Sequence, residues 1–339
     1  MVAKDIALVT GGAGFIGSHI VDLLLEKGFE VRVLDNLSGG RLKNLEQHKS
    51  NQLLYFYNYD ITEIETNHPI FHDVKWLFHL AGIGDIVPSI EKPLDYFNAN
   101  SYGTARIAEA AKAAGVEKVV YAASSSCYGL ADVPTNELAP INPQYPYALT
   151  KYIGELTLFH WHKVYGLPVN SIRIFNAYGP RSRTSGAYGA VFGVFLKQKI
   201  AGKALTVVGD GNQSRDFVYA TDVAKAFVAA AQTDKVGEIY NIGYGKPRKI
   251  IELTKLLSDE IIRIPERPGE PKCTWADISK ISNELGWTPE ITLEEGVSKL
   301  LQDVSYWEDA PLWDEVSIEK ATKIWFDYLG NSPEQTRSS

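Results

Sequence analysis

The sequence predicts an α/β fold, in which a doubly wound parallel sheet is followed by a smaller C-terminal α+β lobe. Two observations carry this prediction. Short apolar runs alternate with amphipathic stretches through about the first 175 residues, a pattern typical of parallel strands joined by helical crossovers. Beyond that point, turns marked by glycine and proline come at irregular intervals among short helical segments, which indicates a mixed lobe. We therefore expect three regions, 1–175, 176–302 and 303–339.

The individual elements follow from these patterns. Apolar runs predict strands at Ile6–Thr10, Val31–Asp35, Leu53–Tyr57, Trp76–Leu80, Val119–Ala123 and Ser171–Phe175. Amphipathic runs predict helices at Phe15–Lys27, Ser101–Ala114, Tyr147–Val164, Val191–Ile200, Thr221–Ala231 and Ile250–Leu257. We expect the chain to cross back into the sheet near 218–222 and 239–242. The third region carries Trp307, Trp313 and Trp325, and a helix is expected near Ile318–Tyr328.

Composition excludes several classes of protein. The chain is 45% hydrophobic and 22% charged, with a net charge of −7, which argues against a nucleic-acid-binding surface because phosphate contacts need clustered Lys and Arg. No apolar run approaches the roughly 18–20 residues that span a bilayer. The two cysteines, Cys127 and Cys273, lack a metal-binding spacing, so we expect no zinc site and no disulfide framework. A strand follows the N-terminus at once, without a signal peptide. A cytoplasmic protein is expected.

A glycine motif lies between the first strand and the first helix. It reads Gly11-x-x-Gly14-x-x-Gly17, and glycine there permits a tight turn, a close approach of the backbone to a pyrophosphate and close packing of helix on strand. The N-terminus of the helix supplies N–H groups and a positive dipole end. Asp35 ends the next strand, where a carboxylate accepts both ribose hydroxyls of an adenosine and repels a 2′-phosphate. The motif predicts a dinucleotide site and favours NAD over NADP.

Two further strand ends belong to the predicted dinucleotide site. Asp60-Ile61 follows the third strand and could hold the adenine edge, although an ordinary turn aspartate is the alternative. Leu80-Ala81-Gly82 ends the fourth strand with small residues, as needed where a ribose crosses the strand ends. His79 is expected to be a structural histidine rather than a catalytic one.

A phenol and an ammonium lie one helical turn apart. Tyr147 and Lys151 are i and i+4, so they project from one face of the predicted helix. A free tyrosine titrates near pH 10 and is a poor base at neutral pH, but a nearby ammonium and an oxidised nicotinamide both favour the phenolate and lower that pKa. Ser124, at the end of the fifth strand, can hydrogen-bond the same substrate oxygen. These three residues are our catalytic candidates, with Tyr147 as the base. Tyr145 has Leu149 at i+4 and is excluded.

The ordered motifs resemble those of the extended short-chain dehydrogenase/reductase family, in particular its nucleotide-sugar epimerases. The resemblance extends over about residues 5–300. The landmarks beyond those above are Asn100-x-x-Gly103-Thr104, Ser124–Gly129, Arg173-x-Phe175-Asn176-x-Tyr178-Gly179-Pro180, Gly209-Asp210-Gly211-x-x-x-Arg215-Asp216-Phe217, Arg267-Pro268-Gly269-Glu270 and Leu285-Gly286-Trp287. It implies an NAD-binding Rossmann domain at 1–175, a nucleotide-sugar-binding lobe at 176–302 and a tryptophan-rich extension at 303–339.

The same resemblance assigns expected roles to single residues. At the cofactor it places Phe15, Ile16, Asn36, Gly39, Asn100, Tyr147 and Lys151 beside the residues already named. At the substrate it implies that Asn176 holds the diphosphate or the near side of the sugar, that Arg215 pairs with phosphate, and that Arg267 and Glu270 grip phosphate and ribose. Ala190, Val191, Thr206 and Val208 would sandwich the base. Relatives commonly dimerise through the helices corresponding to Ser101–Ala114 and Tyr147–Val164, so a homodimer is expected, with Ile107, Ile153, Leu156 and Phe159 as candidates for the contact or for the monomer core.

The residues after Ser124 separate the reactions of the family. Relatives that eliminate water carry Asp-Glu there, whereas this chain has Ser125 and Ser126, which are expected to contact the sugar. The expected reaction is therefore NAD-dependent C4 epimerisation of a UDP-sugar through a transient 4-keto intermediate. Thr274 is small at the position that resembles the sugar-pocket gate, which leaves space for an N-acetyl group, so UDP-GlcNAc/GalNAc and UDP-glucose/galactose rank first. Arg183 falls where uronate epimerases place a carboxylate-reading arginine. A uronate 4-epimerase, another dehydratase or reductase, and a non-catalytic NAD-binding module are the alternatives.

Overall fold

The computed structural model describes residues 4–182 and 191–329 of the 339-residue chain. Its main feature is a seven-stranded parallel sheet with the strand order β11-β6-β5-β4-β1-β2-β3. The strands are β1 (Ile6–Thr10), β2 (Glu30–Leu34), β3 (Leu54–Tyr57), β4 (Val74–His79), β5 (Lys118–Ser124), β6 (Val169–Ile174) and β11 (Glu238–Ile242). The strand order reverses between β1 and β4 while all seven strands stay parallel, as in a doubly wound sheet. The predicted α/β fold class is confirmed.

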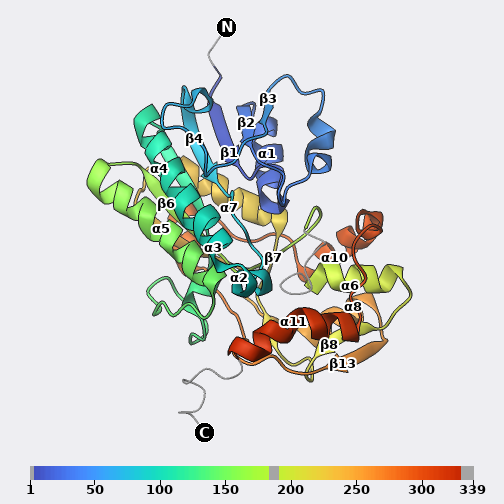
Figure 1. Cartoon of the computed structure of the whole chain (residues 1–339). Coiled ribbons are helices and arrows are strands. Elements are labelled where there is room, and N and C mark those ends of the chain that lie inside the picture. Colours follow the sequence, from blue (N-terminus) through green and yellow to red (C-terminus); the bar gives the residue numbers. More distant parts are fainter. Residues whose placement is uncertain (1–3, 183–190, 330–339) are drawn as a thin grey trace.

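Helices cover both faces of this sheet (Figure 1). On one face, α1 (Phe15–Glu26) and α7 (Ala220–Gln232) pack together over a cluster that includes Val9, Val33 and Phe227. On the other face, α4 (Gly103–Ala114) and α5 (Pro146–Tyr165) enclose a second cluster. Parallel strands covered on both faces have continuous apolar sequences rather than alternating ones. This is why the short apolar runs were readable as strands.

The helix expected from Ser101 has a more complex beginning. Short α2 (Val87–Glu91) and α3 (Pro93–Tyr96) precede a π-helical turn, η3 (Phe97–Tyr102), and α4 starts only at Gly103. A Cβ on Gly103 would lie 2.6 Å from the end of the Ile61 side chain, so a larger residue there would require Ile61 to shift. The π turn places Asn100 inside the protein, where it reaches the loop after β4.

The second lobe consists of short two-stranded sheets with helices around them. β7 (Asn176–Tyr178) pairs with β10 (Phe217–Tyr219), β8 (Leu205–Val208) with β13 (Ile261–Ile264), and β9 (Ser214–Arg215) with β12 (Arg248–Lys249). The helices are α6 (Val191–Ile200), α8 (Ile250–Leu257), α9 (Ser279–Leu285) and α10 (Leu293–Gln302). Their apolar core includes Trp307, which is fully buried.

The tryptophan-rich segment returns to the first lobe. After η5 (Val304–Trp307), the helix α11 (Glu315–Leu329) runs beside α2 and close to β8 and β13 (Figure 1). The expected helix near Ile318–Tyr328 is therefore present. Its buried face carries Ile318, Thr322 and Trp325.

Candidate functional site

A cleft of about 830 Å³ lies between the carboxyl ends of the large sheet and the second lobe. Ligands of open α/β sheets bind in this crevice, where the strand order reverses. Its walls bring together every predicted site residue in the described part of the chain except Asn100. Two predicted residues, Arg183 and Ala190, lie outside the described residues. The groups that the sequence scatters over about 250 positions thus face one space.

The glycine motif forms a tight turn at the floor of the cleft. Gly11 has φ of +70°, and a Cβ there would lie 2.7 Å from the backbone nitrogen of Ala81. A Cβ on Gly17 would collide with the carbonyl oxygen of Gly11. The residue before α1, Gly14, supplies no side-chain cap, and the first turn of α1 contains no acidic residue. The first N–H groups of α1 are therefore left to bind a pyrophosphate.

Asp35 lines the cleft directly after β2, beside the glycine turn. Its carboxylate accepts hydrogen bonds from the backbone N–H groups of Ala13, at 3.0 Å, and Leu37, at 2.8 Å. These bonds oppose the effect of burial, which raises the pKa of Asp35 above its usual value. A Cβ on Gly40 would come within 2.7 Å of the same carboxylate. Both oxygens are thus fixed on the glycine turn, and the group fits an adenosine ribose better than a 2′-phosphate.

The Asp60 carboxylate already has hydrogen-bond donors within the protein. It accepts hydrogen bonds from Asn36 Nδ2, at 2.7 Å, and from the Thr62 backbone, at 2.8 Å. Asn36, Gly39, Asp60 and Ile61 line the same stretch of the cleft. Asp60 therefore orients Asn36 as well as contributing to the wall.

His79 is structural, as expected. Its Nδ1 is 2.7 Å from Thr10 Oγ1 and its Nε2 is 3.0 Å from Thr104 Oγ1, so both ring nitrogens are occupied. Complete burial lowers the pKa of His79 to about 3. A neutral imidazole then ties β1 and β4 to α4 and cannot act as a proton carrier at neutral pH.

Asn100 lies behind the cleft wall rather than in it. Its Oδ1 accepts a hydrogen bond from the N–H of Ile83 at 2.8 Å, and its Nδ2 donates to the carbonyl of Ile83 at 3.1 Å. A Cβ on Gly82 would meet Asn100 Oδ1 at 2.5 Å. Asn100 therefore fixes the loop after β4, and that loop lines the cleft.

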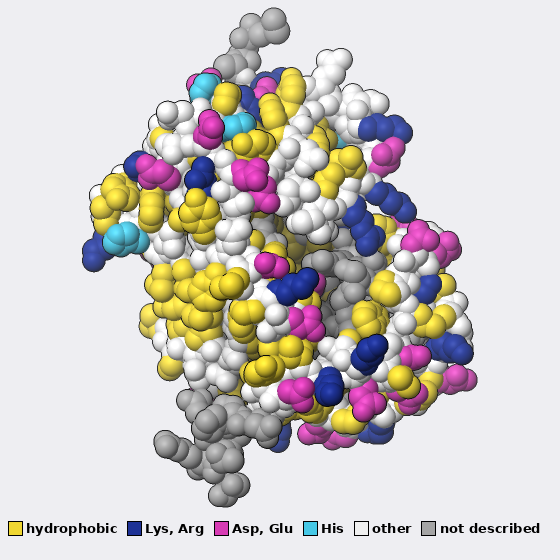
Figure 2. Space-filling view, viewed as in Figure 1, with side chains coloured by type: hydrophobic (Ala, Val, Ile, Leu, Met, Phe, Trp, Pro, Cys, Tyr) yellow, Lys and Arg dark blue, Asp and Glu magenta, His cyan; other side chains and the backbone are white. Residues whose placement is uncertain are grey.

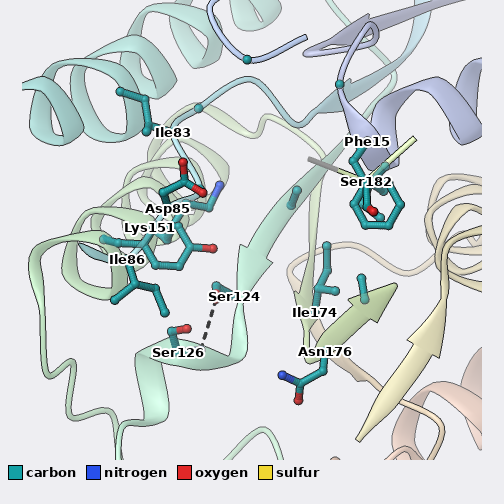
Figure 3. A pocket seen from close by; sticks show the side chains of 18 of the residues that line it. Phe15, Ile83, Asp85, Ile86, Ser124, Ser126, Lys151, Ile174, Asn176 and Ser182 are labelled. Carbon is teal, nitrogen blue, oxygen red and sulfur yellow. Dashed lines mark hydrogen bonds between the residues drawn. The ribbon is translucent and has the colours of Figure 1, made fainter. Parts of the chain in front are cut away.

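Tyr147, Lys151 and Ser124 converge on the cleft from α5 and the end of β5. Figure 3 shows Lys151 and Ser124 on this side of the cleft, together with Ser126, whose backbone N–H donates to Ser124 Oγ at 3.2 Å. Burial lowers the pKa of Lys151 to about 7, against an opposing effect of Glu155. Burial raises the pKa of Tyr147, and a hydrogen bond with Ser124 opposes the rise. Burial outweighs the other influences of the protein on the Tyr147 pKa, and the lowering expected from Lys151 together with an oxidised nicotinamide stays a prediction.

The structure contains a buried ion pair beneath Lys151 that was not predicted from the sequence. Glu155, one turn further along α5, accepts hydrogen bonds from Ser171 Oγ, at 2.7 Å, and from Arg173 Nε, at 3.1 Å. Arg173 Nη1 also donates to the Tyr128 hydroxyl at 2.8 Å. The i, i+4 spacing from Lys151 was a signal in the sequence for Glu155. No such signal indicated the partners of Glu155, because they lie on β6, a distant segment. Within this pair, the carboxylate of Glu155 is the charge that favours protonated Lys151.

The second lobe places a carboxylate and two guanidinium groups at the far end of the cleft. Arg215 Nη2 donates to Glu270 Oε1 at 2.6 Å, and Arg267 Nη1 lies 3.7 Å from Glu270 Oε2. Among the described residues, that Oε2 is buried without a hydrogen-bond donor. The hydroxyl of Thr274 donates to Asn176 Oδ1 at 2.6 Å, which fixes the Asn176 amide. This end combines positive charge for phosphate with an acceptor for a hydroxyl.

Other cleft residues were missed. The loop after β4 brings Ile83, Asp85 and Ile86 to the side of the cleft that holds Lys151 (Figure 3). Asp85 also raises the pKa of Tyr147. The signal for this loop was available, because segments that follow parallel strands line the ligand crevice. Tyr145, excluded as a base, is a wall residue too.

Within the described residues, no group of His, Cys, Asp or Glu could hold a metal ion. Nor does that part of the chain contain a helix with the length and apolarity required to cross a membrane.

Where a glycine turn meets a tyrosine and a lysine at one sheet edge, an enzyme can act on its substrate beside a bound dinucleotide. Residues 7–243 match the NAD dependent epimerase/dehydratase family. The chain belongs to this family, and its cofactor is NAD.

Similar proteins include several sugar-nucleotide enzymes. A putative UDP-glucose 4-epimerase of Methanocaldococcus jannaschii is 38% identical over 303 residues, which are 87% of this chain and 96% of the relative. A UDP-glucuronate 4-epimerase of Thermodesulfobacterium geofontis is 35% identical over 94% of this chain and 98% of its own. The solved structure of UDP-N-acetylglucosamine 4-epimerase from Methanobrevibacter ruminantium, in complex with UDP-N-acetylmuramic acid, has a TM-score of 0.83 and 33% identity, covering 89% of this chain and 100% of that one.

Proposed function

We propose that the protein is a nucleotide-sugar 4-epimerase that interconverts the C4 epimers of a UDP-sugar. The observation that carries this proposal is a single cleft that joins the dinucleotide turn, the pair Tyr147 and Lys151, and the charged end at Arg215 and Glu270. A nucleoside-diphosphate sugar has one anionic part and one neutral part. The charged end suits the former, and the Tyr147 end suits the latter.

The side chains define the acid–base chemistry. NAD supplies the hydride chemistry at C4, accepting a hydride and returning it. Tyr147 removes the proton of the C4 hydroxyl and later gives it back, while Ser124 hydrogen-bonds the same oxygen. The negative charge of Glu155 favours protonated Lys151. In that form, the Lys151 ammonium stabilises the Tyr147 phenolate. Arg215 and Arg267 hold the diphosphate, so the keto sugar can rotate about that linkage and present its other face.

The cleft favours epimerisation over elimination. Ser125 and Ser126 stand where removal of water from the sugar needs an additional acid and base, and hydroxyl groups there serve as hydrogen-bond partners for the sugar. We infer UDP-GlcNAc/GalNAc and UDP-glucose/galactose as the substrates, because Thr274 is small and is held by Asn176. A uronate substrate is the second candidate, since a UDP-glucuronate 4-epimerase is among the similar proteins.

The test is a Tyr147→Phe variant assayed on a panel of UDP-sugars, with products resolved by NMR. The variant should lose at least about 10²-fold in epimerisation rate, the usual effect of removing a general acid/base. Tyr165→Phe is the matched control, because Tyr165 is exposed at the end of the same helix. Wild-type protein should carry NAD through turnover and need no added cofactor. A Tyr147→Phe rate close to wild type contradicts the proposal, and turnover of UDP-glucuronate alone replaces the inferred substrates with the second candidate.

We further infer that the enzyme is a homodimer through α4 and α5. Exposed apolar side chains on α5 include Leu156, at 49% exposure, and Leu149, at 39%, and Tyr102, directly before α4, is 50% exposed. Ile107, one candidate for the contact, is instead fully buried in the core of the monomer.

A further inference from the structure

The helix α11 (Glu315–Leu329) touches the cleft near its beginning. Ile318 is 4% exposed, packs with Val208 and Ile264, and lines the cleft beside them. Val208 is one of the residues expected to hold the base. The first turn of α11 therefore covers the end of the cleft where β8 and β13 lie.

The segment that leads into α11 is tied to the same strands. Gln198 Nε2, on α6, donates to the carbonyl of Trp313 at 2.7 Å and lies 2.9 Å from Thr206 Oγ1. The backbone N–H of Thr206 in turn donates to Gln198 Oε1 at 3.1 Å. Gln198 is 1% exposed, so these bonds are protected from water and fix the start of α11 against a wall residue.

The last turns of α11 bring Trp325 behind two other walls. Trp325 is 1% exposed. Its Nε1 donates to the carbonyl of Pro268 at 2.7 Å, and its ring lies 5.7 Å from that of Tyr145. Pro268 belongs to the turn that presents Arg267 and Glu270 to the cleft. The indole therefore holds the backbone of the turn that carries the charged groups.

An aromatic row connects Trp325 to the proposed base. The ring of Tyr145 lies parallel to that of Tyr147, with centroids 6.4 Å apart and an angle of 5° between them. Tyr145 also forms a hydrogen bond with Ser126. Trp325 thus packs against Tyr145 beside the proposed base and holds the Pro268 turn at the charged end of the cleft.

We propose that α11 forms part of the substrate site and that Trp325 is a positioning residue for the nucleoside diphosphate. This inference rests on the proposed function. By fixing Pro268, Trp325 sets where Arg267 and Glu270 meet phosphate and ribose, and Ile318 closes the side of the cleft next to the base. Trp325 is not among the residues that line the cleft, so we expect it to contribute to substrate affinity through the turn that it holds.

The experiment is steady-state kinetics of full-length Trp325→Ala with NAD bound. KM for the UDP-sugar should rise about 10-fold, a change of one decade in affinity, while kcat stays within about 3-fold. The Kd of UDP alone, measured by calorimetry, should rise by the same factor, and the NAD content should be unchanged. A uniform loss of folded protein would instead lower the active fraction and leave KM unaltered.

Three variants complete the design. Trp325→Phe keeps a ring beside Tyr145 but removes the indole N–H, and should raise KM by about 3-fold, as expected for one lost hydrogen bond. Tyr328→Ala and Val316→Ala change exposed residues of the same helix and should leave KM at its wild-type value. If Trp325→Ala fails to fold, Trp325→Phe decides the question through the same KM and Kd.

The outcomes separate the two proposals. Wild-type protein that neither binds UDP nor converts a UDP-sugar contradicts the proposed function. Active wild-type protein whose Trp325→Ala and Trp325→Phe variants keep the wild-type KM and UDP affinity overturns the role of α11 and leaves the epimerase in place. A fall in kcat with unchanged KM also overturns it, because positioning of the nucleotide is then not what Trp325 provides.

Discussion

Lys151 is almost completely buried, and its burial has a measurable consequence for the stability of the protein. It is 7% exposed, its Nζ lies 4.4 Å from the centroid of the Tyr121 ring, and burial lowers its pKa from 10.5 to about 7. Below pH 7 the side chain holds its proton in both folded and unfolded states, so the folded state bears the full cost of a buried ammonium. Between pH 7 and 10.5 the folded protein releases that proton while the unfolded chain keeps it, and the cost falls as pH rises.

We predict that Lys151→Met raises thermal stability while lowering activity by at least about 10²-fold. The gain in Tm over wild type should be larger at pH 6 than at pH 9, because the apolar side chain removes a cost that is greatest when the lysine is charged. Melting curves at both pH values and equal NAD occupancy provide the measurement. Lys163→Met, at an exposed position on the same helix, should show no such pH dependence. A variant that is less stable than wild type at pH 6 disproves the account.

Residues whose role follows from local spacing could be predicted from the sequence. The glycines of the turn, Asp35 at a strand end, and the i, i+4 pair Tyr147 and Lys151 each belong to one short segment. Residues whose role depends on a distant partner could not. Arg173 is tied to Glu155 only because β6 lies under α5, and Asn100 faces Ile83 only because a π-helical turn precedes α4.

At the scale of elements, the segment η5 is joined to the region that encloses Asp35. The hydroxyl of Tyr306 donates to Asn44 Oδ1 at 3.0 Å, and Asn44 Nδ2 donates to the carbonyl of Ala13 at 2.8 Å. The N–H of Ala13 in turn bonds Asp35. The C-terminal segment therefore supports the backbone that donates a hydrogen bond to the Asp35 carboxylate.

We predict that Tyr306→Phe weakens NAD binding about 5-fold, the effect of losing one hydrogen bond to a partner that is then left unsatisfied. The NAD retained after gel filtration and the Kd from calorimetry measure this change, while KM for the UDP-sugar should stay constant. Leu312→Ala, an exposed position of the same segment, is the control. Equal NAD retention in Tyr306→Phe and wild type contradicts the prediction.

The strands and the first helix were predictable because burial on both faces leaves a continuous apolar run, and a helix after a glycine turn has a clear start. The second lobe was less readable. β9 and β12 have only two residues each, and their pairing depends on contacts between distant segments rather than on periodicity. The position of α11 against the first lobe had no sequence signal beyond Trp325 and the two tryptophans that precede the helix, Trp307 and Trp313.

For the whole molecule, exposed apolar side chains on α5 and on the segment before α4 point to association of two copies. Figure 2 shows hydrophobic side chains gathered over α3 and α5 on the face in view. Leu94, Tyr102, Leu149 and Leu156 are between 39% and 78% exposed, and contiguous apolar surface of this kind commonly marks an interface.

We predict that Leu156→Glu converts a dimer into a monomer at micromolar concentration, because an interface cannot bury an unpaired carboxylate without a large cost. Light scattering coupled to gel filtration gives the mass directly. Val236→Glu, exposed in the turn after α7, should leave the dimer intact. Wild-type protein that elutes as a monomer of 37.6 kDa refutes the dimer.

The contact between Trp325 and Pro268 also bears on the order in which the protein matures during translation. The glycine turn and the Tyr147 helix leave the ribosome before α7 and β11, which complete the large sheet and its helical cover. The contact of Trp325 with Pro268 forms only after the last helix has been synthesised. On the role proposed for Trp325, every segment of the cofactor fold is therefore synthesised before the turn of Arg267 is fixed for a sugar nucleotide.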